Sequence, residues 1–148
     1  VQRALKDKGL HEENWIDCKA VPSEKVPDEL AQCDLGIALR ELSFSTQAIL
    51  PIKLGEYLLA GLPVIGTPGV GNTEQLNEFG VFRSAEADDL EETISWVVNE
   101  VLPSRALMRE KSHAAGKNYF SLESTVDSYE TALSSISNRS KPLDGYGN

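Results

Sequence analysis

The fold is decided by one stretch of sequence, PIKLGEYLLAGLPVIGT, which runs from Pro51 to Thr67. A helix is predicted from Pro51 to Ala60, because proline suits a first helical turn and Gly61 is a typical residue just past a helix end. Pro63 then opens a short apolar run that ends at Gly66, the length of a buried strand. A helix that leads directly into such a strand is one unit of an α/β domain.

Outward from this stretch, apolar runs of strand length alternate with helical patterns. Strands are predicted at residues 15–18, 34–39, 63–66 and 80–83. Helices are predicted at residues 1–8, 28–32, 51–60, 72–78, 87–102, 103–120 and 123–136. The alternation is typical of a Rossmann-like parallel sheet flanked by helices. One domain is expected over residues 1–137, followed by a polar, flexible tail at residues 138–148.

Two of these elements carry more specific expectations. The helix at residues 87–102 has an apolar stripe that is expected to face the core, formed by Leu90, Ile94, Val97, Val98 and Val101. The strand at residues 15–18 is expected to pair directly with the strand at residues 34–39, unless another chain fills the gap between them.

Composition excludes several classes of protein. The chain has 148 residues and a formal net charge of -9, which argues against nucleic acid as a partner. No apolar stretch approaches the roughly 18 residues of a membrane span, and no signal-peptide pattern opens the chain. Cys18 and Cys33 form no metal-binding spacing, so they are expected to be buried free thiols in a cytoplasmic protein.

The start of the helix at Pro51 predicts an anion site. Leu50 offers no side-chain oxygen to cap the free N–H groups, and Lys53 lies in the first turn, where the helix dipole is already positive. A phosphate held by Lys53 and by the backbone of Leu50, Pro51 and Ile52 removes both faults. The alternative is a solvated lysine at a frayed helix end.

Glu56 lies three residues after Lys53, so both side chains face the same way. One interpretation is an ordinary ion pair on a helix surface. The other is a carboxylate that accepts two hydrogen bonds from a vicinal diol, such as that of a ribose. With Lys53 on phosphate, this second arrangement is a nucleotide clamp.

Two loops follow the predicted strands, at the sheet edge where parallel sheets bind their ligands. The loop at residues 40–50 carries the hydroxyls of Ser43, Ser45 and Thr46. The loop at residues 67–72 carries Gly69, Gly71 and Asn72. The two glycines form an incomplete dinucleotide motif, because Glu74 stands where a third glycine is needed. The alternative for this loop is a tight turn between a strand and a helix.

The same residues resemble the donor-binding segment of family 4-type glycosyltransferases with the GT-B fold, in the variant P-x-K-x-x-E-Y-L-x-x-G-x-P-V-I. The stretch from Gly69 to Asn72 is similar to the G-V-G-D of many relatives, and residues 21–38 are similar to the sequence that precedes the segment. Two positions depart from the pattern. Ala48 replaces the first glutamate of the family's E-x7-E pattern, and Leu50 replaces a frequent serine.

The resemblance implies a retaining glycosyltransferase that moves a sugar from a nucleoside-diphosphate sugar to an acceptor, which is a glycan, a lipid or a small molecule. Glu56 matches the glutamate that holds the donor ribose, and the backbone at residues 50–52 matches the diphosphate site. Ser45, Thr46, Gly69, Gly71 and Asn72 are expected to line the same cleft. No cofactor and no protein-bound metal are expected.

The resemblance also implies that this chain is most of a C-terminal GT-B domain without its first strands. It is expected to need the missing N-terminal domain for the acceptor and to be nearly inactive alone, in the cytoplasm or at the periphery of a membrane. Self-association is left open. The alternatives are a non-catalytic nucleotide-binding module and a GT-B-type sugar-nucleotide epimerase.

Overall fold

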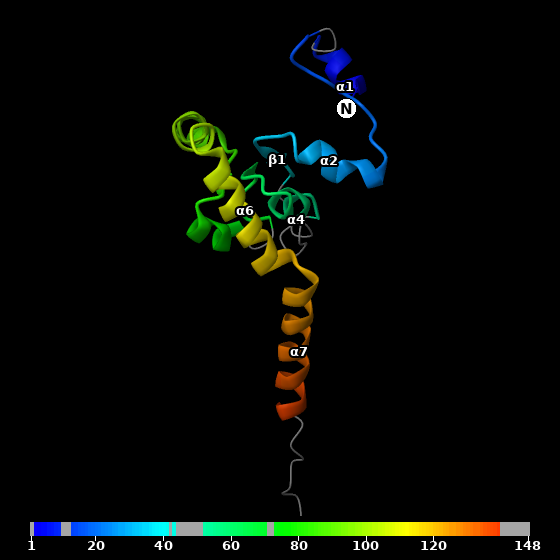
Figure 1. Ribbon diagram of the computed structural model, residues 1–148, viewed down its shortest axis with the longest axis vertical. Coiled ribbons are helices and arrows are strands. Elements are labelled where there is room, and N and C mark those ends of the chain that lie inside the picture. The colour runs from blue at the N-terminus through cyan, green and yellow to red at the C-terminus, as the bar shows by residue number, and fades with distance from the viewer. Residues whose placement is uncertain (1, 10–12, 42, 44–51, 71–72, 140–148) are drawn as a thin grey trace, which may run out of the picture.

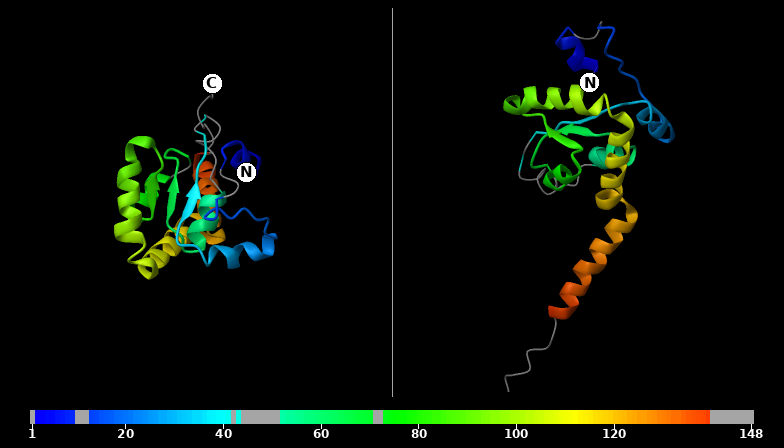
Figure 2. Two further views of the ribbon diagram at one scale, coloured as in Figure 1. Left: turned by 90° about the horizontal axis from the view of Figure 1, so that it is seen from above. Right: turned by 60° about the vertical axis from the view of Figure 1, so that its left-hand side comes forward.

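A computed structural model describes residues 2–9, 13–41, 43, 52–70 and 73–139 (Figure 1). Three short strands form one parallel sheet in the order β1–β2–β3, with β1 at Gly36–Ala38, β2 at Val64–Gly66 and β3 at Phe82–Ser84. Helices lie on both sides of this sheet (Figure 2, left). The predicted α/β class is therefore confirmed, and the arrangement is compatible with a Rossmann-like fold.

The helical segments follow the predicted order. They are α1 (Gln2–Asp7), η1 (Ser23–Lys25), α2 (Val26–Leu30), α4 (Ile52–Leu59), η2 (Thr73–Phe79), η3 (Ala87–Asp89), α5 (Leu90–Trp96), η4 (Val97–Val101), α6 (Arg105–Phe120) and α7 (Leu122–Arg139). The predicted tail overlaps the last two residues of α7, and residues 140–148 lie outside the described ranges. Within those ranges, no helix combines the length and apolar character needed to cross a bilayer.

The end of α4 is fixed as the sequence predicts. Gly61 has a φ of +80°, and its N–H donates to the carbonyl of Leu58 at 2.9 Å. The N–H of Leu62 donates to the carbonyl of Tyr57, also at 2.9 Å. These two bonds close the helix on a left-handed residue that glycine adopts without strain. The chain then turns directly into β2.

The main core lies between the sheet and the helices α4, α6 and η2. It is formed by the buried side chains of Leu54, Leu58, Val64, Leu76, Val81, Phe82 and Ala115. Gly36 lets α4 approach β1, because a Cβ at this position would lie 2.5 Å from the ring of Tyr57. The close approach brings the first turns of α4 beside the carboxyl ends of β1 and β2.

Helix α6 contacts several segments that lie far apart in the sequence. At its middle, a Cβ on Gly116 would lie 2.7 Å from the backbone nitrogen of Leu59, so the two helix backbones touch. One turn earlier, Nδ1 of His113 lies 2.7 Å from the carbonyl oxygen of Leu59. Arg109 donates to the carbonyls of Ala31 and Cys33 at 2.9 and 2.5 Å. These contacts place α4 and the turn after α2 around one rigid helix.

The opposite face of the sheet has a smaller core, which Trp96, Val101 and Met108 form with Ile65 and Leu35. The guanidinium of Arg83 lies 4.8 Å from the centre of the Trp96 ring, at cation–π distance. This layer does not cover β1, since Ile37 and Leu39 are 59% and 61% exposed. Within the described residues β1 pairs only with β2, so its outer edge is free.

The predicted strand at residues 15–18 is wrong, and so is its predicted pairing with residues 34–39. The chain turns there, with the N–H of Ile16 bonded to the carbonyl of Glu13 at 3.1 Å, and Trp15 is exposed. A strand requires a neighbour for its backbone hydrogen bonds. Within the described residues this segment has no neighbouring strand.

The predicted long helix at residues 87–102 is divided into η3, α5 and η4. Its last part is a π-helical turn, in which the N–H of Leu102 bonds to the carbonyl of Val97. The buried side is formed by Thr93, Trp96 and Val101. Leu90, Ile94 and Val98 of the predicted core stripe are exposed. The sheet that the described residues form has three strands, and the helix buries part of its apolar surface against it.

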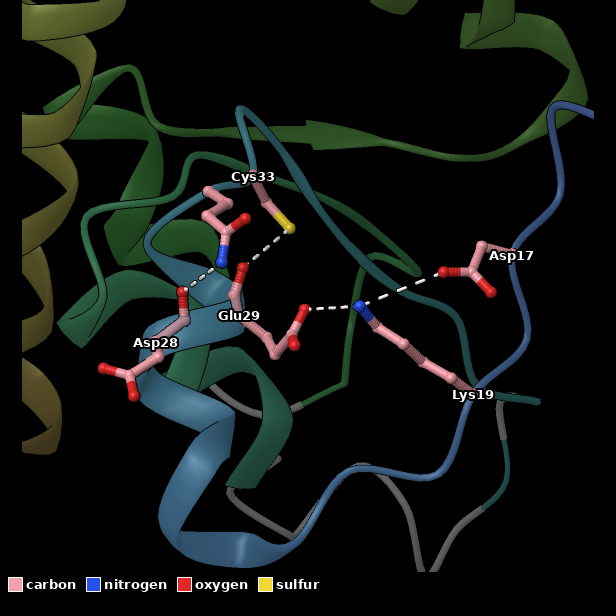
Figure 3. A network of polar contacts seen from close by, with 6 residues as sticks. Asp17, Lys19, Asp28, Glu29 and Cys33 are labelled. Carbon is pink, nitrogen blue, oxygen red and sulfur yellow. Dashed lines mark hydrogen bonds and ion pairs between the residues drawn. The ribbon is translucent and has the colours of Figure 1, made fainter.

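The prediction of buried thiols is also wrong, because Cys18 and Cys33 are both exposed. They belong to a segment around α2 that packs outside the core. Polar contacts organise this segment (Figure 3): Nζ of Lys19 lies 2.6 Å from Glu29 and 3.9 Å from Asp17. The thiol of Cys33 donates to the carbonyl of Glu29 at 3.4 Å. The hydrogen bond and charge of Glu29 raise the pKa of Lys19.

Candidate functional site

The predicted site residues fall into two groups. Ile52, Lys53, Glu56 and Gly69 belong to the described structure. The others lie outside the described residues, namely Ser45, Thr46, Leu50, Pro51, Gly71 and Asn72. The proposed capping of the helix start by an anion therefore stays a prediction. Among the described four, only Lys53 and Glu56 contact each other.

Lys53 and Glu56 form an ion pair one turn apart on α4. Nζ of Lys53 lies 2.7 Å from Oε2 of Glu56, and the two side chains are 62% and 39% exposed. The hydrogen bond that Lys53 donates to Glu56, followed by the charge of Glu56, raises the pKa of Lys53. An exposed pair of this kind contributes only about 0.2–1 kcal/mol to stability. The pair is therefore available to a ligand at little cost to the fold.

The titration of Lys53 gives a direct test of this pair. Because its folded-state pKa is raised above 10.5, the pair stabilises the fold fully below that pH and is lost as pH rises through the folded-state pKa. In Glu56→Gln, the Lys53 pKa is expected to fall toward its ordinary value. NMR titration of the Lys53 side chain measures both values. Equal pKa values in the two proteins would show that the pair does not persist in solution.

A hollow of about 230 Å³ lies at the carboxyl ends of β1 and β2, and we call it the strand-end hollow. Its polar lining is formed by Arg40, Lys53, Thr67 and Thr73. The backbone N–H of Arg40 donates to Oγ1 of Thr67 at 3.0 Å, which ties the two strand ends together. Among the described lining residues there are two cations and no carboxylate. On a chain of net charge -9, this lining is locally rich in positive charge.

A larger groove of about 570 Å³ runs between the α2 segment and α4, and we call it the α2–α4 groove. One wall is mostly apolar and is formed by Val21, Ser23, Val26, Pro27 and Leu30. The other wall is α4, with Lys53 and Glu56 nearest its start and Leu59 and Ala60 at its end. Lys53 also lines the strand-end hollow, so the two cavities share this residue.

Other predicted residues take no part in these cavities. Ile52 is 75% exposed and Gly69 forms a turn with a φ of +75°, and neither lines the hollow or the groove. Instead Val70, the next residue, lines the strand-end hollow. The alternative that this loop is a tight turn is therefore the one that the geometry of Gly69 supports.

Sequence reasoning missed Arg40, Thr67 and Thr73 as individual residues. Arg40 lies two positions after β1, and Thr67 follows β2 directly. The available signal was their place at the carboxyl ends of neighbouring parallel strands, where side chains converge. Thr73 had no such signal, because it approaches the hollow from the first position of η2 and is buried there.

A third hollow, of about 590 Å³, lies between η2 and the junction of α6 with α7. It is lined by aromatic and small polar side chains, among them Tyr119, Phe120 and Tyr129, and no charged side chain is among its described lining residues. It therefore suits an anionic ligand less well than the two cavities at Lys53. Over the described ranges, no three Asp, Glu, His or Cys side chains gather where they could hold a metal ion.

The chain was also compared with known proteins. No protein-family model, curated protein or solved structure matches it.

Proposed function

We propose that this chain is the donor-binding part of a retaining glycosyltransferase that uses a nucleoside-diphosphate sugar. The observation that carries the proposal is the position of Lys53, which lines both the strand-end hollow and the α2–α4 groove. A nucleotide sugar has an apolar base and a sugar joined by a diphosphate. Two unequal cavities that share one cation match that distribution of charge.

In this proposal the base and ribose occupy the α2–α4 groove. The groove has a volume within the range of about 300–1,000 Å³ usual for small-molecule sites. Val21, Val26 and Leu30 offer an apolar wall to the flat face of a base, and Glu56 accepts hydrogen bonds from the ribose diol. The ion pair of Glu56 with Lys53 then opens, since the carboxylate turns to the diol and the ammonium to the phosphate.

The diphosphate lies between Lys53 and Arg40, and the sugar faces Thr67 and Thr73 in the strand-end hollow. During transfer, the acceptor's hydroxyl oxygen bonds to the anomeric carbon as the bond between that carbon and the diphosphate oxygen breaks. Negative charge grows on the departing diphosphate, which takes up the proton that the acceptor hydroxyl loses. Two cations at that place stabilise the leaving group more strongly in the transition state than in the ground state. The acceptor is bound by another part of a longer protein.

A non-catalytic nucleotide-binding module is the second candidate. It is favoured by one observation: Glu56 is the only carboxylate among the described residues that line the groove or the strand-end hollow, and it is engaged with Lys53. The described residues of these cavities thus offer binding groups but no free general base. Both candidates need the same nucleotide site, and turnover in a longer protein distinguishes them.

Titration with UDP, GDP and ADP, followed by amide NMR shifts, tests the shared site. We expect shifts at Lys53–Tyr57 together with Arg40 and Thr67, largest for one base, and weaker shifts in the same amides with inorganic phosphate. The free nucleoside is expected to affect the α2–α4 groove but not Arg40. Absence of shifts at millimolar nucleotide, or shifts confined to other regions, would overturn the assignment of this site.

A further inference from the structure

Helix α7 carries an apolar stripe that faces solvent. The stripe consists of Leu122, Val126, Tyr129, Leu133 and Ile136, whose side chains are between 45% and 79% exposed. Their spacing alternates between four and three residues, which is the heptad pattern that places side chains along one side of a helix. Figures 1 and 2 show that α7 extends away from the sheet and from the helices that flank it.

The composition of α7 indicates that the stability of this helix depends on packing of its apolar side. Hydroxyl side chains occupy much of its remaining surface, and those of Thr125, Ser128 and Thr131 donate to backbone carbonyls four residues earlier. Serine and threonine are mediocre helix formers, partly because of such competing bonds. Most of the stability of a helix in a protein comes from burying its apolar side. A covered stripe is therefore what stabilises α7 best.

The charges beside the stripe indicate what covers it. Glu123 and Glu130 lie one heptad apart along one edge, and Thr125 and Ala132 lie along the other. In an antiparallel pair of α7 helices, the glutamate edges would face each other. In a parallel pair, they would face the edge that carries Thr125 and Ala132. Neither arrangement of two copies gives these carboxylates an opposite charge.

The length of the stripe also argues against a simple pair of α7 helices. The whole of α7 has 18 residues and spans about 27 Å, which is shorter than the three to four heptads typical of a coiled coil. A groove between two elements of a partner buries more of each side chain, as when an amphipathic helix lies in an apolar groove. The third hollow extends this surface, because Tyr129 belongs to both. A lipid surface fits less well, since helices that lie on membranes carry Lys and Arg on their polar side.

We propose that α7 is the inserted helix of a protein–protein interface. Its stripe lies in an apolar groove of a partner whose rim carries Lys or Arg opposite Glu123 and Glu130. This interface is separate from the nucleotide site, and its test uses no nucleotide.

The probe is a designed helical hairpin with an apolar groove, made in one version with a lysine rim and in one with a glutamate rim. We expect the lysine version to bind about tenfold more tightly, a difference of about 1.4 kcal/mol, and to protect α7 amides from exchange. The double substitution Glu123→Lys with Glu130→Lys is expected to reverse the preference. Equal binding of both versions, or an unchanged preference in the double variant, would contradict the charge assignment.

Single substitutions separate the stripe from the rest of α7. Leu133→Asp is expected to abolish binding to the lysine hairpin. Thr131→Asp places the same charge on the side of α7 away from the stripe, and it is expected to change the affinity for the lysine hairpin by no more than about twofold. Amide shifts around Leu58 report that the domain is folded in each variant.

Sedimentation is expected to show a monomer, and vesicles of zwitterionic or anionic lipid are expected not to bind α7. A dimer that Leu133→Asp disrupts, or vesicle binding through the stripe, would overturn the proposal.

Discussion

Gly116→Ala is expected to lower the free energy of unfolding by about 1–3 kcal/mol, the usual cost of overpacking. The added methyl would lie 2.7 Å from the backbone nitrogen of Leu59 and 2.8 Å from the carbonyl carbon of Leu58. Backbone atoms cannot rotate away as a side-chain tip does, so α4 and α6 must separate. Separation loosens Leu54, Leu58 and Ala115, which form the main core.

This prediction opposes the ordinary effect of the substitution. Within an exposed helix, alanine is more favourable than glycine by about 1 kcal/mol, so helix propensity alone predicts a more stable protein. Urea unfolding of Gly116→Ala measures which effect dominates. Lys117→Ala changes the next, exposed residue of α6 and is expected to stay within about 0.5 kcal/mol. An unchanged or higher midpoint in Gly116→Ala would show that the two helices separate at no cost.

Glu56→Ala is expected to weaken binding of the preferred nucleoside diphosphate by about tenfold to a hundredfold, if the proposed nucleotide site is correct. Hydrogen bonds that involve a charged group contribute about 1.5–3 kcal/mol when they are buried by a ligand. Removal of Glu56 also frees Lys53 from its 2.7 Å ion pair. Inorganic phosphate is therefore expected to bind the variant at least as tightly as the unaltered chain.

The 2′-deoxy form of the same nucleotide isolates the contact with the ribose. It is expected to bind the unaltered chain more weakly than the parent nucleotide, and to bind Glu56→Ala with the same affinity as the parent. Glu29→Ala is the control, because Glu29 has the same 39% exposure, pairs with Lys19 at 2.6 Å (Figure 3) and lines neither cavity. An equal loss of nucleotide affinity in Glu29→Ala would show that the effect comes from the change in net charge rather than from Glu56.

Local signals predicted the centre of the fold. Gly61 and Pro63 marked the end of α4 and the start of β2, because glycine adopts the left-handed conformation that ends a helix and proline cannot continue one. Neither effect needs help from distant contacts. The i,i+3 spacing of Lys53 and Glu56 predicted that they meet. The strand predicted at residues 15–18 is wrong because, within the part of the chain that the structure describes, no neighbouring strand is there to take up its backbone hydrogen bonds. The predicted burial of Leu90, Ile94 and Val98 is wrong, because it depended on how wide the sheet beneath the helix is.

Contacts between distant parts of the chain were beyond prediction. Arg109 bonds to carbonyls 76 and 78 positions earlier, and nothing around Arg109 indicates that partner. The convergence of Arg40 with Thr73 likewise depends on the whole sheet. The sequence indicated which loops would surround the site, whereas the residues that line it followed from the packing of η2 and α4 against the strands.

The placement of β2 between β1 and β3 has a consequence for how the native state opens. Ile65 pairs with Arg83, 18 positions away, and with Ile37, 28 positions away. Loop closure differs between the two pairs by only about 0.4 kcal/mol, so chain length does not decide their relative stability. Burial does, because Val64 and Val81 are fully buried whereas Ile37 is mostly exposed. β1 is thus the strand expected to detach first in sub-global opening, and Arg40 would leave the strand-end hollow with it while β2, β3 and the core at Leu58 persist.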